Sequence, residues 1–128
     1  ITSETVFYYP YVELTEKTLQ SILIKRPFIL IGPAHSLKYL RSLGYKTFGK
    51  IIDESYDEIE DPNERMEKIM TIVRDFNNKP VEQNKKLLLE IKDDLLHNYF
   101  LLVKQIKNLR KTTEKGIIKY VNNRKNFN

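Results

Sequence analysis

The chain contains no cysteine and no tryptophan, and only four of its 128 residues are glycine. The absence of cysteine excludes disulfides, thiolate nucleophiles and cysteine-ligated metals. No run of residues is long and apolar enough to cross a membrane as a helix. The sequence also lacks a glycine-rich phosphate loop, a metal-ligand set, a nucleophile triad and the aromatic signature of common RNA-binding modules. We therefore expect no metal and no cofactor, and the sequence identifies no catalytic residue.

The composition fits one soluble globular domain. Hydrophobic residues make up 41% and charged residues 30% of the chain, and this length is enough for one core but short for two domains. The first residue is Ile1 and no initiator methionine is present, so we interpret the chain as a piece of a larger protein or one whose start is unseen. A cytoplasmic location is the default expectation.

The net charge of +5 is unevenly distributed along the chain. Residues 1–84 carry 11 Lys or Arg against 13 Asp or Glu, whereas residues 85–128 carry 11 against 4. A basic half of this kind can meet phosphates, a membrane surface or an acidic partner. The alternative is a solvated helical face, which is the more ordinary interpretation.

The first third of the chain predicts a strand, a helix, a second strand and a loop. Residues 1–11 are rich in strand formers up to Pro10, and the tyrosines among them are packing residues or a stacking surface. Thr15 is a suitable helix cap, with Leu14 as its hydrophobic anchor, and we expect Pro27 to stop that helix. The apolar run 28–31 is typical of a strand covered on both faces.

Two parallel strands joined by a helix form a right-handed crossover, and such sheets bind ligands beyond the carboxyl ends of their strands. The start of the helix and the loop after the second strand would meet at that edge. We therefore expect Glu16, Lys17 and His35 to share one rim.

The middle of the chain predicts shorter elements. Ser36 is a plausible cap for a short helix that Gly44 closes in a left-handed conformation, and residues 45–48 are a short strand or extended segment. The acidic stretch 53–58 is either a site for a metal or acid–base chemistry, or a solvated loop before a helix. The solvated loop is favoured because no calcium-loop spacing and no nearby histidine accompany the carboxylates.

Helices dominate the rest of the sequence. Asp61 followed by Pro62 and Glu64 is a strong helix start, and residues 77–80 break the chain before a new helix begins. Helical spacing then continues beyond residue 81, either interrupted at His97 and Asn98 or running on through residue 109.

The predicted rim has a specific chemistry. A helix start attracts anions through its free N–H groups and its partial positive charge. Lys17 adds a full charge suited to a diphosphate, and Glu16 is an acceptor suited to sugar hydroxyls. The alternative is an ordinary pair on a helix surface, with His35 an ordinary loop residue.

Four segments carry a family resemblance. They read LTEKT at 14–18, RPFILIG at 26–32, LKYLRSLGYKTF at 37–48 and IDESYD at 52–57. This pattern resembles glycosyltransferase-like proteins of phages, viruses and bacteria, in particular their carboxyl-terminal halves. The Glu-Lys helix start before a Pro-led strand is also similar to the nucleotide-sugar half of fucosyltransferases with two Rossmann-like domains, the GT-B architecture.

The resemblance covers about residues 1–100 and implies roles for individual residues. In the fucosyltransferases the Glu contacts the ribose and the Lys the diphosphate, which would place these roles on Glu16 and Lys17. The acceptor-binding half, which would carry a catalytic base, is absent, and the basic helical tail lies outside the resemblance. The chain would then be a donor-binding half, or a relic of one reused for assembly.

We therefore expect an α/β fold with a small Rossmann-like parallel sheet and flanking helices over residues 1–80. A helical extension with a basic tail follows over residues 81–128. The function expected is binding of a nucleotide-sugar donor, and the substrate-binding residues expected are Thr15, Glu16, Lys17, Gly32, His35 and Ser36. The alternative is a structural or interaction module of a viral or phage assembly, in the host cytoplasm or virion, which would dock an upstream domain or its own copy. Nucleic-acid binding by the basic helices ranks below both.

Overall fold

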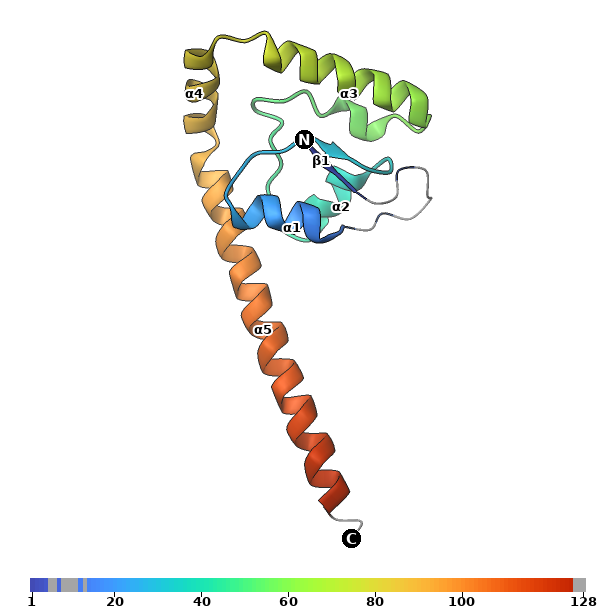
Figure 1. Cartoon of the computed structure of the whole chain (residues 1–128), viewed down its shortest axis with the longest axis vertical. Coiled ribbons are helices and arrows are strands. Elements are labelled where there is room, and N and C mark those ends of the chain that lie inside the picture. Colours follow the sequence, from blue (N-terminus) through green and yellow to red (C-terminus); the bar gives the residue numbers. More distant parts are fainter. Residues whose placement is uncertain (5–6, 8–11, 13, 126–128) are drawn as a thin grey trace.

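The structure is a computed structural model that describes residues 1–4, 7, 12 and 14–125, with the side chains of residues 117–125 left out. It is mixed α/β and mostly helical, with a two-stranded parallel sheet (Figure 1). The elements in chain order are β1 Thr2–Ser3, α1 Glu16–Leu23, β2 Leu30–Ile31, α2 Ser36–Ser42, the 3-10 helix η1 Ser55–Glu58, α3 Pro62–Asn77, α4 Val81–Glu90 and α5 Lys92–Lys125.

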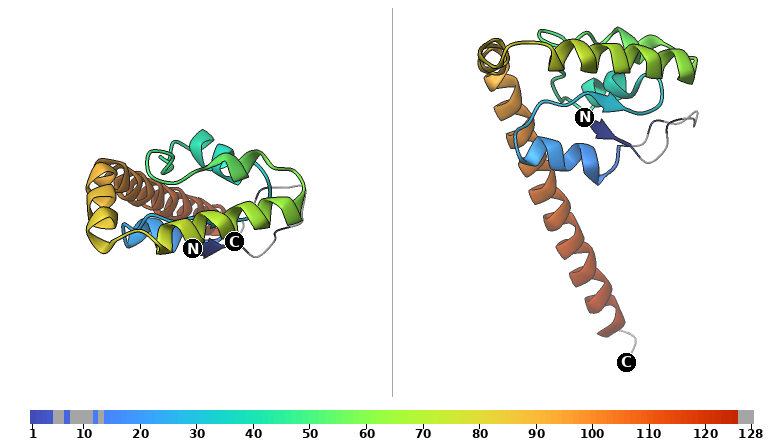
Figure 2. Two further views of the ribbon diagram at one scale, coloured as in Figure 1. Left: turned by 90° about the horizontal axis from the view of Figure 1, so that it is seen from above. Right: turned by 45° about the horizontal axis from the view of Figure 1, so that its top comes forward.

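The strand–helix–strand prediction is confirmed. Strands β1 and β2 run parallel, with Thr2 opposite Leu30 and Ser3 opposite Ile31, and α1 makes the connection. Helix α1 lies on one side of the sheet and α3 on the other (Figures 1 and 2). The carboxyl ends of both strands therefore lie at one edge, as a parallel crossover requires.

The two outer edges of this sheet differ. On the β2 side, the Tyr56 hydroxyl accepts a hydrogen bond from the outward-facing Leu30 N–H at 3.1 Å, and it is buried there. On the β1 side, the register turns the backbone of Ser3 outward, and no further strand among the described residues pairs with it. An open edge of this kind is able to accept another strand.

Both strands are shorter than the sequence predicted. The first was expected over residues 1–11, but β1 contains only Thr2 and Ser3, and the Tyr8, Tyr9 and Tyr11 cluster lies outside the described residues. In the predicted strand 28–31, only Leu30 and Ile31 belong to β2. Phe28 and Ile29 are nevertheless buried, so the apolar run correctly predicted burial but not the length of the strand.

Helix α1 begins as predicted and ends earlier. Thr15 is its N-cap, and the Thr15 hydroxyl accepts a hydrogen bond from the Lys17 N–H. The helix was expected to run to Pro27 but ends at Leu23. Lys25 adopts a left-handed conformation with φ of 53°, which breaks the helical repeat before the proline is reached.

The segment after α2 follows the sequence prediction. Gly44 has φ of 91°, in the left-handed region where glycine is favoured, and residues 45–48 are extended without forming a strand. Phe48 packs edge-on against Phe28, with ring centroids 5.2 Å apart. This segment belongs to the core, whose buried apolar side chains include Ile22, Leu30, Leu37, Leu40, Tyr45, Tyr56, Ile69, Ile72, Ile91 and Leu102.

The start of α3 and the break after it are confirmed. The Asp61 carboxylate accepts hydrogen bonds from the N–H groups of Asn63 and Glu64, and Pro62 occupies the first turn. The helix ends at Asn77, and α4 begins at Val81 after Pro80.

A second break falls at Ile91, not at His97 and Asn98, where the sequence left an interruption open. Ile91 is completely buried between α4 and α5. From Lys92 the helix α5 runs on for 34 residues and passes through Gly116 without a break. No helix among the described residues is both long and apolar enough to span a membrane.

Helix α5 is fastened to the body near its beginning. The buried Asn98 side chain accepts a hydrogen bond from the Lys46 N–H at 2.7 Å and donates one to the Lys46 carbonyl at 2.8 Å. Two turns farther on, Gln105 accepts a hydrogen bond from the Tyr45 hydroxyl at 2.6 Å. The Asn98 amide thus makes the two hydrogen bonds with the Lys46 backbone that a neighbouring strand would otherwise make.

Replacing Asn98 with alanine is expected to lower the free energy of unfolding by about 2 kcal/mol, because both backbone groups of Lys46 lose their partners. Urea unfolding followed by circular dichroism measures the loss. The control is Asn108→Ala on the exposed part of α5, which should change stability by less than about 0.5 kcal/mol. Equal effects of the two substitutions would contradict the role given to Asn98.

Candidate functional site

The carboxyl edge of the sheet is organised around Glu4, directly after β1. One carboxylate oxygen of Glu4 accepts hydrogen bonds from the Thr15 N–H at 2.9 Å and from the Thr15 hydroxyl, and the other accepts one from the Thr18 hydroxyl. Glu4 is only 5% exposed and Thr18 is fully buried. The carboxylate therefore binds the start of α1, the position that an anion would otherwise take.

The loop after β2 meets the same carboxylate from the other side. A side chain at Gly32 would place its Cβ 2.9 Å from the Ser36 Oγ and 3.6 Å from the Glu4 Cγ, so the position has room only for glycine. The Ser36 hydroxyl is buried and donates to the Pro33 carbonyl at 2.6 Å. The structure thus brings Thr15, Gly32 and Ser36 together around Glu4, as parts of the fold's own hydrogen bonding.

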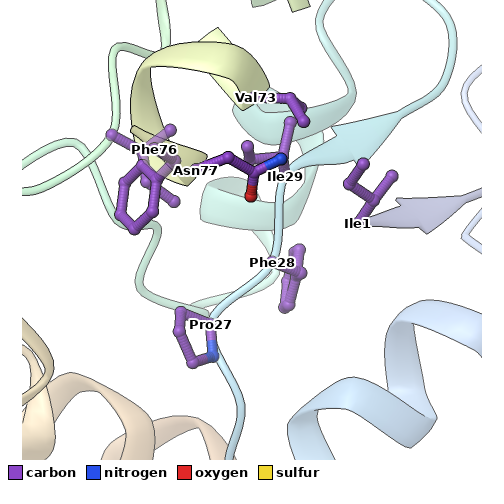
Figure 3. Close-up of a pocket in the computed structure, with 8 residues that line it drawn as sticks. Ile1, Pro27, Phe28, Ile29, Val73, Phe76 and Asn77 are labelled. Atoms are coloured by element: carbon purple, nitrogen blue, oxygen red, sulfur yellow. The ribbon is translucent and has the colours of Figure 1, made fainter. Parts of the chain in front are cut away.

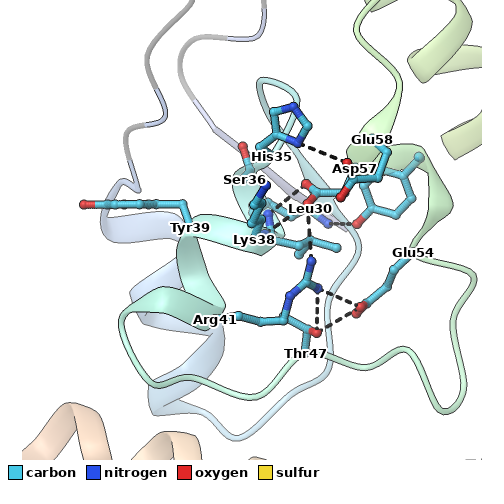
Figure 4. Close-up of polar contacts among 12 residues, drawn as sticks. Leu30, His35, Ser36, Lys38, Tyr39, Arg41, Thr47, Glu54, Asp57 and Glu58 are labelled. Atoms are coloured by element: carbon cyan, nitrogen blue, oxygen red, sulfur yellow. Dashed lines mark hydrogen bonds and ion pairs between the residues drawn. The ribbon is translucent and has the colours of Figure 1, made fainter.

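A second carboxylate binds the start of α2. Asp57 is buried, and its two oxygens accept hydrogen bonds from the N–H groups of Leu37 at 2.8 Å and Lys38 at 3.0 Å (Figure 4). The prediction that Ser36 caps this helix is wrong, because Ser36 is already helical and Asp57 provides the capping oxygens from η1. Aspartate is a strong capping residue, and here it acts from 20 residues away.

His35 belongs to a different cluster from the one predicted. It has φ of 65°, and its ring nitrogens lie 3.4 Å from Glu58 Oε2 and 2.9 Å from Glu60 Oε1 (Figure 4 draws Glu58). No contact among the described residues joins His35 to Glu16 or Lys17. The placement of these three residues on one shared rim stays a prediction.

Glu16 and Lys17 are both exposed at the start of α1. Lys17 lies on the α1 surface one turn before Ser21, and it lines a shallow groove with Ser3 and the beginning of β1. This groove follows the open edge of the sheet and does not include the loop 32–36. Of the six predicted substrate-binding residues, these two have exposed side chains that the fold itself does not use.

Two further charged residues were missed by the sequence analysis. Glu54 accepts hydrogen bonds from the Phe48 N–H at 2.6 Å, the Thr47 hydroxyl at 2.9 Å and Arg41 at 3.2 Å. Arg65 is buried, and its guanidinium donates to the carbonyls of Gly32 at 3.2 Å and Ile59 at 2.6 Å. Both hold loops in place, and helical spacing could not reveal either contact.

One group of side chains has metal-ligating atoms close together. Ligand atoms of His35, Asp57 and Glu58 all lie within 4.8 Å of one another. Both oxygens of Asp57 already accept hydrogen bonds from backbone N–H groups of α2, and the His35 ring also pairs with Glu60. The arrangement is accounted for as a helix cap with a histidine–carboxylate pair, and we assign no metal to it.

A cavity lies at the opposite edge of the sheet. It has a volume of about 250 Å³ and is lined mainly by apolar side chains from before the two strands and from α3, including Ile1, Phe28, Val73 and Phe76 (Figure 3). Parallel sheets bind their ligands at the carboxyl ends of the strands, and this cavity lies at the amino ends. It therefore lends no support to the predicted site.

Part of the acidic stretch 53–58 is the solvated surface that the sequence favoured, since Asp53 and Glu58 are exposed. Glu54 and Asp57 instead accept backbone hydrogen bonds from Phe48 and Leu37 and so hold these segments in place. Asp53 at its start is exposed, and it pairs with Lys68 at 2.8 Å and accepts a hydrogen bond from the Ser55 N–H. These contacts lower the pKa of Asp53 to about 2. Burial raises the pKa of Tyr56, so this hydroxyl stays protonated beside β2.

Comparisons with family models, with curated proteins and with solved structures find no match to this chain.

Replacing Glu4 with glutamine is expected to lower the free energy of unfolding by about 1–3 kcal/mol, because an NH₂ group would face N–H and O–H donors. The matched control is Glu16→Gln at the exposed start of the same helix, with an expected change below about 0.5 kcal/mol. Chemical unfolding measures both. A Glu4→Gln variant as stable as the control would contradict the role of Glu4 as the binding partner of α1.

Replacing Lys68 with methionine is expected to raise the pKa of Asp53 from about 2 toward the model-peptide value of 3.8. A carboxyl whose pKa is lowered by folding stabilises the fold above its unfolded pKa, and this contribution disappears as the pH falls toward 2. Carbon-detected NMR titration of the Asp53 carboxyl measures the shift. Lys92→Met is the control and should leave the Asp53 titration in place.

Proposed function

We propose that the β1–α1–β2 unit is the donor-binding part of a glycosyltransferase that uses a nucleotide sugar. The parallel crossover is the observation that carries the proposal, because it presents the start of α1 and the loop after β2 at the edge where α/β sheets bind ligands. The resemblance in segments 14–18, 26–32, 37–48 and 52–57 supports the same assignment. In this interpretation the sheet is the Rossmann-like core of one half of a GT-B enzyme.

The contacts around Glu4 change how a nucleotide sugar would be held. The Glu4 carboxylate is bound to Thr15 at the start of α1, and its negative charge would repel a second anion there, so a diphosphate would bind mainly through the Lys17 side chain. The exposed Glu16 carboxylate beside it would accept hydrogen bonds from ribose hydroxyls. Thr15, Gly32 and Ser36 then support the site without contacting the ligand, and His35 lies outside it.

The open edge of β1 is consistent with a larger enzyme. The Ser3 backbone faces outward, and a further strand paired there would extend the sheet past the groove that Lys17 lines. Parallel sheets of two strands are rare on their own. The donor site would then be completed by residues contributed by another segment or another chain.

In an isothermal titration with GDP- and UDP-sugars, replacing Lys17 with alanine is expected to weaken binding by about tenfold or more, since a charged contact to the diphosphate is lost. Lys92→Ala, at an exposed lysine in the first turn of α5, is the control and should leave the affinity unchanged. The unmodified chain must first give measurable heat at millimolar ligand. An absence of binding, or equal binding by the two variants, would count against a donor site at α1.

A second candidate function is an interaction module, and a separate observation favours it. Every described side chain of α5 from Ile106 to Lys115 is exposed, so this stretch of the helix is not buried against the rest of the described chain. The threonines and Gly116 are weak helix formers, so this exposed stretch has little helix stability of its own. A helix of this composition gains its stability from packing against a partner.

A further inference from the structure

The end of α5 is a basic arm that projects from the body. We define the arm as residues 106–125, which follow the last described contact of α5 with the body at Gln105. It carries seven Lys or Arg against one acidic residue, Glu114. Glu114 pairs with Arg110 at 2.8 Å, so the single acid of the arm is already engaged and the arm keeps a net positive charge.

The arm also has an apolar side. Ile106 and Leu109 lie three residues apart, so they share one helical face, and they are 47% and 68% exposed. Leu102, one turn before Ile106, is buried in the core. The arm therefore continues the apolar stripe of α5 into solvent, beside a surface of lysines and arginines.

The opposite charge lies at the other end of the same molecule. Residues 53–68 contain eight Asp or Glu against two Lys or Arg. Six of these acids are exposed, between the residues just before η1 and the first half of α3. We call them the acidic ridge: Asp53, Glu58, Glu60, Asp61, Glu64 and Glu67. Lys68 pairs with Asp53 at 2.8 Å, and the eight acids of this stretch still outnumber its two cations, so the ridge keeps a negative charge.

An apolar side chain accompanies the ridge. Met70 is 42% exposed and lies three residues after Glu67 on the same helix. A methionine is flexible enough to pack against side chains such as Ile106 and Leu109. The ridge thus offers both the charge and the apolar contact that the arm lacks in its own molecule.

The arm cannot reach the ridge within one chain. Helix α5 is continuous, and it carries the arm away from the body on the side opposite to α3 (Figures 1 and 2). We propose that the arm of one copy docks on the acidic ridge of a second copy of this chain. The proposal deepens the interaction-module candidate and is independent of the donor site.

The number of contact surfaces on each copy limits which assemblies can form. Each copy has one arm and one ridge, so two copies close as a twofold pair with two contacts, or the contacts continue from copy to copy as a chain. Both arrangements depend on charge and weaken as salt rises, because the Debye length falls from about 10 Å at 0.1 M to about 3 Å at 1 M.

The test compares the full chain with two charge-reversed variants. The arm variant is Lys107→Glu, Arg110→Glu and Lys111→Glu, and the ridge variant is Glu64→Lys and Glu67→Lys. Light scattering after size exclusion is expected to give at least twice the 15.3 kDa monomer mass for the unmodified chain at low salt, and the monomer mass at high salt. Each variant alone should be monomeric, with unchanged melting of the body measured by circular dichroism.

Mixing the two variants is the decisive step, because reversed arms and reversed ridges again carry opposite charges. The mixture is expected to recover the mass lost by each variant, whereas simple misfolding of a variant could not be rescued in this way. A mixture that stays monomeric, or an unmodified chain that is monomeric at every concentration, would overturn the proposal.

Two further outcomes would overturn it, and the first of them would identify a different partner. A monomeric chain that binds a single-stranded oligonucleotide through the arm, and loses this binding in the arm variant, would identify a nucleic acid. A monomeric chain whose arm has little helix content by circular dichroism would reject the second copy and leave the interaction module in need of another partner.

Discussion

The contact between the Glu4 carboxylate and the start of α1 holds the parallel sheet to its connecting helix. Strand β1 has only two residues and forms few backbone hydrogen bonds with β2, so its pairing alone contributes little. Glu4 follows directly, and its two oxygens bind Thr15 and Thr18 of the next element. A buried carboxylate is stable only when its oxygens are well paired, and the helix start provides both N–H and O–H donors. The crossover depends on this ionic cap.

Carboxylates also bind backbone N–H groups at other places in the chain that the structure describes. Asp57 binds the start of α2, Asp61 binds the start of α3, and Glu54 binds the extended segment at Phe48. Carboxylates placed inside or beside the fold in this way leave its helix starts with little attraction for outside anions. A nucleotide sugar bound here would depend on side chains such as Lys17, so the donor proposal rests on few residues.

Local features were predictable from the sequence, because they depend on neighbouring residues. Thr15, Asp61 and Gly44 act where short-range rules place them, and the apolar run 28–31 is buried. Ser36 failed as a cap because Asp57 competes for the same N–H groups from 20 residues away, and sequence spacing carries no record of that contact. Glu4 was missed for the same reason, since its partners lie 11 and 14 residues farther along the chain. The pairing of His35 with Glu58 and Glu60 was missed as well, because these partners lie 23 and 25 residues farther along the chain.

The first turns of α5, which include Asn98, pack against the body, and its later described turns are exposed to solvent. Its first turns pack on α1 and on the segment 44–48, and its last turns extend into solvent without a break. If a partner stabilises the exposed end of α5, a force on that end is carried along the helix to the Asn98 amide and the backbone of Lys46. Binding at the exposed end of α5 would therefore also act on the segment 45–48 beside the core.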